Sequence, residues 1–438
     1  MADFAARPHS LEQWLDYQQA VHGPAIDLSL ERVRCVASTL DLLHPRCPLA
    51  IIGGTNGKGS TATMLAAMLR ACGRRVGLFT SPHLLRYAER VQLDGEPVGE
   101  ASLVAAFERI ERARGATTLT FFEYNTLAAL QIFHDSNVDA LVLEVGLGGR
   151  LDATNFLDAD VAVLCSVGID HRDWLGDTLE AIGREKAGIF RPGQPVVLGS
   201  PDMPSTVWEA VSSLGCRAYT AGRDFQWRAR QDDVLAATPI PAADWDYDGP
   251  RCRLTQLPAP ALPGAIQYGN AASALTALQL LEVPGACERE RIGQALRSVH
   301  LPGRLQIERI DGIEWILDVA HNAAAAEVLA RALHLKAGDG RTIAVMGVLA
   351  DKDAAAIAHA LDDEADVWVL AGLVGEARGQ SAEALAARLG PLRSTPLQAA
   401  TVPEALQQAR ALARPGDRIV VFGSFHAVGP ALAWLGLY

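Results

Sequence analysis

The stretch that decides the fold is IIGGTNGKGST, residues Ile51 to Thr61, in which four glycines, one lysine and three hydroxyl residues directly follow an apolar run. A strand that ends at Gly53, a glycine-rich turn and a helix that begins near Ser60 would direct several backbone N–H groups and the positive end of a helix dipole at one point. Phosphate groups bind at such points. The stretch therefore predicts a loop that binds the phosphates of a nucleotide.

The spacing in this loop differs from the common phosphate-loop pattern G-x-x-x-x-G-K-[ST]. Gly53 and Gly57 enclose three residues rather than four, and Gly59 separates Lys58 from Ser60. We expect Lys58 to neutralise charge on the β- and γ-phosphates, with the hydroxyl residues after it on a phosphate or on Mg²⁺. The alternative is a glycine-rich turn with a solvent-facing lysine, which the preceding strand and the complete run GTNGKGS make much less favourable.

Composition and charge limit the classes of protein to which this chain could belong. A chain of 438 residues with 49% hydrophobic and 21% charged residues is typical of a soluble globular protein with two domains. The net charge of −12, with no long basic stripe, argues against a nucleic-acid partner. No basic and apolar leader opens the chain, and no apolar run reaches the ~18 residues needed to span a bilayer. We expect a cytoplasmic monomer without a membrane partner.

The seven cysteines are an odd number, are widely spread and include no C-x-x-C pair. This pattern predicts a reducing compartment and a protein with neither a disulfide framework nor a structural zinc site.

The order of apolar runs predicts an α/β fold with two domains. From about 49 to 200, β-branched runs alternate with helical stretches, which is typical of a mostly parallel sheet. Residues of about 217–262 are rich in Pro, Asp, Trp and Arg and predict an irregular or β-rich segment. The run HLPGRLQ, 300–306, predicts a hinge, and strands and Ala-rich helices alternate again after it. We expect a P-loop-type domain, 1–298, with helices on both faces of its sheet, and a Rossmann-like domain, 299–438.

Three polar clusters follow predicted strands in the first domain. Ser81 lies in FTSPHL, Glu144 in LEVGLGGRLDATN and His171 in VGIDHRDWLG. Open α/β sheets bind ligands at the carboxyl ends of their strands, so these side chains could together bind Mg²⁺ beside a triphosphate. Taken singly, each has an ordinary explanation as a helix cap, a paired buried acid or a satisfied histidine. Lys186, in GREKAGIF, is by itself typical of a charged surface helix.

The variant loop resembles the phosphate loop of the Mur-ligase-like, ATP-dependent amide ligases. Within that group, eight motifs are similar to those of bacterial folylpolyglutamate synthases of the bifunctional dihydrofolate synthase type: SPHLLRYAERV, FFEYNTLAAL, LEVGLGGRLDATN, DHRDWLG, GREKAGIF, LPGRLQ, LDVAHN and GSFHAV. The resemblance covers nearly the whole chain and is weakest at about 217–262. It implies a Mur-ligase-like fold and the ligation of L-glutamate to dihydropteroate and to folates, in which ATP first converts the acceptor carboxylate to an acyl phosphate.

The resemblance also implies site residues, and Lys58, His171 and Lys186 are expected to be catalytic. The residues that match the nucleotide site are Thr55, Asn56, Gly57, Lys58, Gly59, Ser60, Thr61, Asn270, Arg304, Asp318 and His321. The residues that match Mg²⁺ positions are Ser81, Glu144, His171 and Lys186, the last as an N-carboxylysine that binds a second Mg²⁺. The residues that match the pterin-side pocket are Asp27, Leu28, Thr120, Phe121, Phe122, Glu123, Leu151, Asp152 and Ala153. There Phe122 could stack on a flat pterin and Asp152 could accept from its N–H groups.

Two other functions compete with this interpretation. A peptidoglycan-building Mur ligase shares the loop and the chemistry, but such enzymes resemble this chain only after an extra N-terminal domain, and 52 residues before Gly53 are too few for one. A regulatory P-loop switch would hydrolyse ATP slowly, whether or not glutamate and pterin are present. No Ser/His/Asp or Cys/His arrangement at a suggestive spacing predicts a nucleophilic enzyme.

Overall fold

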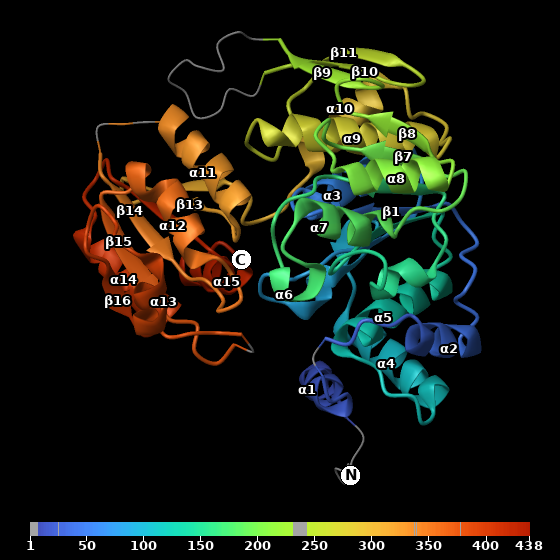
Figure 1. Ribbon diagram of the computed structural model, residues 1–438, viewed down its shortest axis with the longest axis horizontal. Coiled ribbons are helices and arrows are strands. Elements are labelled where there is room, and N and C mark those ends of the chain that lie inside the picture. The colour runs from blue at the N-terminus through green and yellow to red at the C-terminus, as the bar shows by residue number, and fades with distance from the viewer. Residues whose placement is uncertain (1–7, 25, 231–242, 337, 339, 377) are drawn as a thin grey trace.

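The computed structural model describes residues 8–438 apart from 25, 231–242, 337, 339 and 377 (Figure 1). Among these residues, the strands form three sheets. The helices and strands up to α10 form one body, and those from β12 onward form a second body beside it, drawn in orange and red in Figure 1. Within the described part of the chain, no helix is long and apolar enough to cross a membrane.

The first sheet has eight strands in the order β4-β3-β2-β5-β1-β6-β7-β8. From β2 to β8 neighbouring strands are parallel, while β3 and β4 pair antiparallel at one edge. The strands are β1 (Leu49–Gly53), β2 (Val76–Phe79), β3 (Val91–Leu93), β4 (Glu96–Pro97), β5 (Ala140–Glu144), β6 (Val161–Leu164), β7 (Pro195–Leu198) and β8 (Arg217–Thr220). All residues of β1, β5 and β6 are buried, as expected for parallel strands covered on both faces.

Alternate residues of β1 contact two different cores. Leu49 and Ile51 pack in one hydrophobic cluster, and Ala50 and Ile52 pack in another on the opposite face. Helices on the first face are α1 (Leu11–Val21), α2 (Glu31–Thr39), α4 (Glu100–Arg114), α5 (Phe121–Asp135), α7 (Leu179–Ala187) and α8 (Ser205–Ser213). Those on the second are α3 (Lys58–Ala71), α9 (Ile266–Leu280) and α10 (Arg289–Ser298). Short helices η1 (Tyr87–Arg90), η2 (Ala153–Phe156) and α6 (Arg172–Leu175) follow strands.

The segment 217–262 is β-rich, as predicted, in the part that the structure describes. Strands β9 (Gln226–Ala229), β10 (Trp245–Asp248) and β11 (Arg253–Leu257) form an antiparallel sheet in the order β11-β10-β9. This small sheet packs on α9 and α10, and the Tyr247 hydroxyl lies 2.8 Å from Thr276 Oγ1 of α9. Residues 231–242, which belong to the predicted segment, lie outside the described residues.

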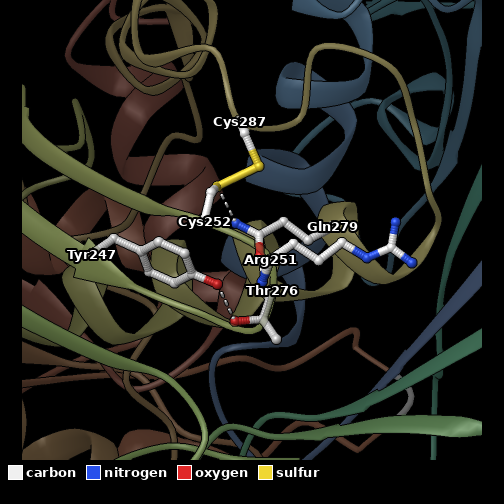
Figure 2. The surroundings of a disulfide bond; sticks show 6 residues. All are labelled: Tyr247, Arg251, Cys252, Thr276, Gln279 and Cys287. Atoms are coloured by element: carbon white, nitrogen blue, oxygen red, sulfur yellow. Dashed lines mark hydrogen bonds between the residues drawn. A yellow bond between two sulfur atoms is a disulfide. The ribbon is translucent and has the colours of Figure 1, made fainter.

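The prediction of a chain without disulfides is wrong at one pair. Cys252, just before β11, is bonded to Cys287, in the connection between α9 and α10, with the two Cα atoms 6.1 Å apart (Figure 2). Gln279 Nε2 of α9 lies 3.0 Å from Cys252 Sγ. The two cysteines meet because the small sheet packs on these helices, an arrangement that their separation of 35 residues does not reveal. The other five cysteines are free.

The second body is a six-stranded sheet in the order β12-β13-β17-β14-β15-β16, parallel except for β12. Its strands are β12 (Gln306–Ile310), β13 (Ile313–Leu317), β14 (Thr342–Met346), β15 (Val367–Ala371), β16 (Leu397–Ala399) and β17 (Arg418–Phe422). Helices α11 (Ala323–Leu335), α12 (Ala354–Leu361) and α13 (Ala382–Leu389) cover one face, η3 (Asp362–Glu364) follows α12, and α14 (Val402–Leu412) and α15 (Phe425–Trp434) cover the other face. A domain boundary between 298 and 299 stays our proposal; α10 ends at Ser298 and β12 begins at Gln306.

The disulfide leads to a prediction about stability. A cross-link over 35 residues restricts the unfolded chain, and such bonds typically contribute about 2–4 kcal/mol to the free energy of unfolding. We expect Cys287→Ser to lower the melting temperature of the non-reduced protein, and dithiothreitol to lower that of the wild type to the same value. Cys35→Ser, at an exposed free thiol, is the control. Equal melting temperatures for all three proteins would contradict the prediction.

Candidate active site

The phosphate loop connects β1 to α3, which begins at Lys58, two residues earlier than expected. Gly57, at the N-cap of α3, has φ of +87°, a backbone conformation that glycine adopts without strain. A Cβ there would lie 2.7 Å from Oδ1 of Asn270, so any larger residue would have to displace the Asn270 side chain. The predicted nucleotide residue Asn270, on α9, is therefore in contact with the loop.

The glycine that distinguishes this loop from the common pattern has a specific environment. A Cβ on Gly59 would lie 3.5 Å from Glu144 Oε2 and 3.8 Å from Arg304 Nη2. The first turn of α3 thus approaches both the carboxylate at the end of β5 and the guanidinium of the hinge segment. A methyl group at this position would make ordinary van der Waals contacts with both charged groups, so Gly59 marks the point where they approach the helix.

Two lysines converge on one carbonyl oxygen of the loop. Lys58 Nζ donates to the carbonyl oxygens of Gly54 and Thr55, both at 3.1 Å. Lys186 Nζ, from α7, donates to the same Gly54 oxygen at 3.0 Å. Lys186 is 5% exposed, so the ordinary interpretation of it as part of a charged surface is wrong. Burial and the charge of Lys58 lower the pKa of the Lys186 amine to about 7.

Two of the predicted metal residues are in direct contact. Glu144, 3% exposed at the end of β5, accepts a hydrogen bond at 3.0 Å from the backbone N–H of Ser81. Burial raises the pKa of Glu144, while the charge of Lys58 and the Ser81 hydrogen bond oppose that rise. A bound cation would favour the ionised carboxylate still further. Glu144 and Ser81 therefore fit a magnesium site that opens toward the phosphate loop.

His171 has an environment that suits a metal ligand. Its backbone is left-handed, with φ of +52°, which is uncommon for a residue other than glycine. Its ring Nδ1 is buried without a hydrogen-bond partner, and Nε2 lies 3.3 Å from Lys352 Nζ. Burial and the charge of Lys352 lower the pKa of His171 to about 3, so the imidazole is neutral at pH 7. A neutral ring with an unpartnered nitrogen is available for coordination.

The protein by itself provides few metal ligands. Among the described residues, no group of three or more His, Cys, Asp or Glu side chains is placed to bind a metal ion. Mg²⁺ usually binds through one or two carboxylates, several waters and the phosphates of its substrate. The sparse ligand set at Glu144 therefore fits Mg²⁺ that arrives with a nucleotide.

The predicted pterin-side residues gather at the start of α5. Thr120 caps this helix, and its N–H donates at 2.7 Å to Glu123 Oε2. Arg32 joins Asp27 to this group, with Nη1 2.8 Å from Asp27 Oδ2 and Nε 3.3 Å from Glu123. The second oxygen of Glu123, Oε1, is buried and lies 3.3 Å from Arg32 Nε in an ion pair. Sequence reasoning missed Arg32, because its position in the chain gives no sign that it contacts the predicted pocket.

The remaining predicted pterin-side residues lie on α5 and on the loop after β5. The Phe122 ring packs so closely on Gly146 that a Cβ there would lie 2.5 Å from its Cζ. Asp152 accepts four hydrogen bonds within its own loop, from N–H groups of Gly146, Leu147 and Thr154 and from the Thr154 hydroxyl. These bonds use the ordinary acceptor capacity of a carboxylate. Asp152 therefore shapes the loop, and a contact between it and the pterin stays a prediction.

Four further residues belong to the predicted pocket. Leu28 and Leu151 are half-buried, and Ala153 is buried at the start of η2. Phe121 stacks edge-on to Tyr87, with ring centroids 6.1 Å apart.

The second body contributes the remaining predicted nucleotide residues. Asp318 accepts from the backbone N–H groups of Leu305 and Ala320 at 2.7 and 2.8 Å, which fixes the chain after the hinge. The Arg304 guanidinium lies 5.1 Å from the ring centroid of Phe425. Burial raises the pKa of Asp318 and lowers that of Arg304, while the charge of each opposes the shift of the other. The hinge thus carries a coupled pair of charges at the edge of the site.

Four side chains join the two bodies next to the loop. Asn56 and Asn322 exchange a pair of hydrogen bonds at 3.1 and 3.0 Å. Asn322 Nδ2 also donates at 3.1 Å to Asp170 Oδ2. Lys352 Nζ lies 2.5 Å from the other oxygen of Asp170, and both side chains of this ion pair are buried.

His321 completes this junction, with Nε2 3.5 Å from Asp170 Oδ2. Burial would raise the pKa of Asp170, but the His321 hydrogen bond and the charge of Lys352 outweigh it and keep that pKa well below its ordinary value. Sequence reasoning quoted the motifs that contain Asp170 and Asn322 without assigning either residue, and it missed Lys352 altogether.

Known proteins are similar to this chain over nearly its complete length. The model of the Mur ligase middle domain matches residues 52–236, and that of the Mur ligase, glutamate ligase domain matches residues 303–425. The dihydrofolate synthase/folylpolyglutamate synthase of Escherichia coli (strain K12) is 43% identical over 97% of this chain and 94% of its own length. The chain belongs to the dihydrofolate synthase/folylpolyglutamate synthase family.

Solved structures of this family share the fold over almost the complete chain. Escherichia coli FolC in complex with DHPP and ADP superposes with a TM-score of 0.89, 40% identity and 98% coverage of each chain. A bifunctional folylpolyglutamate synthase/dihydrofolate synthase with Mn, AMPPNP and L-glutamate bound superposes with a TM-score of 0.88, 42% identity and 98% coverage of each chain. The predicted Mur-ligase-like α/β fold with a separate C-terminal sheet is confirmed.

The junction leads to a prediction about closure in this family member. Lys352→Met would leave the Asp170 carboxylate buried without its cation, an arrangement that costs several kcal/mol unless water reaches it. We therefore expect the two bodies to separate in the variant, which small-angle scattering would show as a larger radius of gyration. Arg378→Gln removes an exposed ion pair to Asp351 nearby and is the matched control. An unchanged scattering profile for Lys352→Met would contradict the role of the pair in closure.

Proposed function

We infer that this chain is an ATP-dependent ligase that attaches L-glutamate to dihydropteroate, which forms dihydrofolate, and to the γ-carboxylate of folates. The observation that carries this conclusion is the loop with Gly59 packed against Glu144 and Arg304, in a chain similar over almost its complete length to the bifunctional synthases. The bound DHPP, ADP, AMPPNP and glutamate of the solved relatives support the same substrates.

The groups proposed to contact the nucleotide lie around the start of α3. The N–H groups there would point toward the phosphates, and Lys58 and Arg304 would provide positive charge beside them. Mg²⁺, when bound at Glu144 and Ser81, supplies further positive charge that favours phosphoryl transfer. Asn270, Asp318 and His321 complete the nucleotide site in this proposal.

The reaction needs no nucleophile from the protein. An oxygen of the acceptor carboxylate attacks the γ-phosphorus, the bond between that phosphorus and the bridging oxygen breaks, and ADP leaves. The amino group of glutamate then attacks the acyl carbon, loses a proton and expels phosphate as the amide forms. The Asp170–Lys352 and Asn56–Asn322 contacts close the two bodies at this point and exclude water, which would otherwise hydrolyse the acyl phosphate.

A carbamate on Lys186 fits its surroundings. Lys58 and Lys186 place two ammonium groups on the Gly54 carbonyl, so their charges repel each other. Addition of CO₂ to the neutral amine of Lys186 would replace this repulsion by attraction and would provide the anionic oxygen that a second Mg²⁺ prefers. His171, with its unpartnered nitrogen, is the other side chain proposed for that ion. Action as a monomer, without nucleic acid, also stays a prediction.

Acceptor-dependent turnover tests the function. We expect phosphate release from ATP only when glutamate and either dihydropteroate or tetrahydrofolate are present. Lys58→Ala should reduce the rate of this release by about 100-fold or more, because a cation that stabilises the transferring phosphoryl group is lost. Arg46→Ala, at an exposed arginine before β1 and so at the opposite end of that strand from the loop, is the control with an unchanged rate. Slow release that ignores both acceptors would favour the P-loop switch instead.

Lys186 provides an independent prediction. Lys186→Ala should be nearly inactive, and acetate or another short carboxylic acid should partly restore its activity by occupying the vacated position. Wild-type protein depleted of CO₂ should regain activity on addition of bicarbonate, and the recovery should become faster as pH rises through about 7, because only the neutral amine adds CO₂. Full activity of Lys186→Ala without any carboxylic acid would rule the carbamate out.

A further inference from the structure

Arg90, at the end of η1, is a buried guanidinium that none of the roles above uses. The residue is 8% exposed, and its guanidinium carbon lies 5.6 Å from the ring centroid of Phe121 and 5.9 Å from that of Tyr87. Its Nε donates at 2.8 Å to Nδ1 of His83. Among the described residues, its Nη1 and Nη2 have no hydrogen-bond partner, although these two nitrogens carry four of its five N–H donors.

The charge of Arg90 is not paired by a hydrogen-bonded anion. Burial and the positive charge of Arg90 lower the pKa of His83 to about 4, so this partner is neutral. Glu89 is already engaged by the backbone N–H groups of Leu84 and Leu85, at 2.7 and 2.9 Å. An arginine stays protonated even where burial lowers its pKa, and a buried charge without a partner is costly. The free Nη edge therefore fits an anion that comes from outside the chain.

The location of Arg90 narrows the choice of anion. On one side it faces the ring of Phe121, which belongs to the proposed pterin-side pocket. On the other side it lies close enough to Glu144, in the proposed metal site, for their charges to act on each other. Nucleotide phosphates already have Lys58 and the N–H groups of α3. The anion that must extend from a pterin pocket to the γ-phosphate is the carboxylate of the acceptor.

We propose that Arg90 binds the carboxylate of the acceptor through Nη1 and Nη2 and directs one of its oxygens at the γ-phosphate. This is the benzoate carboxylate of dihydropteroate or the γ-carboxylate of a folate, and the inference rests on the proposed function. Two parallel N–H···O bonds fix the plane of a carboxylate, and the cation reduces the repulsion between this anion and the triphosphate. His83 is a positioning residue, because its bond to Nε turns the other edge of the guanidinium toward the substrate.

Binding in the absence of ATP separates this role from a structural one. Dihydropteroate and an analogue of it are titrated into the protein by fluorescence or calorimetry. The analogue has aniline in place of p-aminobenzoate and therefore lacks the carboxylate. Arg90→Gln should weaken dihydropteroate binding by about 10- to 100-fold, since it removes a charge-assisted pair, and should leave binding of the analogue unchanged. Arg90→Lys, which keeps the charge without the paired donors, should give an intermediate affinity. Arg86→Gln, at an exposed arginine on the same segment, is the matched control.

Kinetics provides a second measurement on the complete enzyme. Arg90→Lys should raise the KM for dihydropteroate much more than the KM for ATP, because Lys58 and the start of α3 are unchanged. Equal weakening of both ligands by Arg90→Gln would assign Arg90 a structural role and overturn the proposal, as would unchanged affinity for dihydropteroate. If the wild-type chain binds neither ligand, the proposed function itself is wrong, and the proposed role of Arg90 is then wrong as well.

Discussion

The Gly54 carbonyl oxygen, which accepts hydrogen bonds from both Lys58 and Lys186, is the interaction around which the site is arranged. Two positive charges this close repel each other strongly in a buried environment, so the site without ligands is poised for anions. In the proposed function, the phosphates of ATP neutralise the charge of Lys58, and a carbamate replaces the charge of Lys186. Glu144 lies beside the first turn of α3, with Oε2 3.5 Å from the place that a Cβ on Gly59 would occupy.

The same excess of positive charge extends toward the acceptor and toward the second body. Arg90 is buried and Arg304 is half-buried, both contact aromatic rings, and both lie within electrostatic reach of Glu144. Glu144, Asp152 and Asp318, among the carboxylates of the proposed site, accept their hydrogen bonds mainly from backbone N–H groups. Such a distribution suits a reaction in which a carboxylate must approach a triphosphate, because the protein neutralises both reactants.

Polar groups join the two bodies beside the phosphate loop. Asp170 is paired with Lys352 and also accepts from Asn322, which in turn exchanges two hydrogen bonds with Asn56 of the phosphate loop. A buried carboxylate with several donors is stable only while the donors are in place. The phosphate loop is thus linked directly to the α11 end of the second body, and the state of one can affect the other.

Local patterns in the sequence determined much of the fold. The apolar run before Gly53, the glycines after it and the alternation of strands with helical stretches predicted the strand-loop-helix unit, the parallel sheet and the second α/β body, since these depend on neighbours in the chain. Eight motifs in order were enough to indicate the family. Residues within those motifs, such as Lys58 and Glu144, could therefore be assigned to the site by sequence reasoning.

Contacts between distant segments were decided only by the tertiary structure. The Cys252–Cys287 disulfide, the burial of Lys186, the pair of Asp170 with Lys352 and the free Nη edge of Arg90 all arise where separate elements pack together. The spacing of residues along the chain does not predict these contacts, because the pKa, the partners and the exposure of a side chain depend on the elements that pack around it. The sequence by itself thus determined which chemistry this protein could perform, and the packing of β1, α3, α7 and the second body decided where each charge lies.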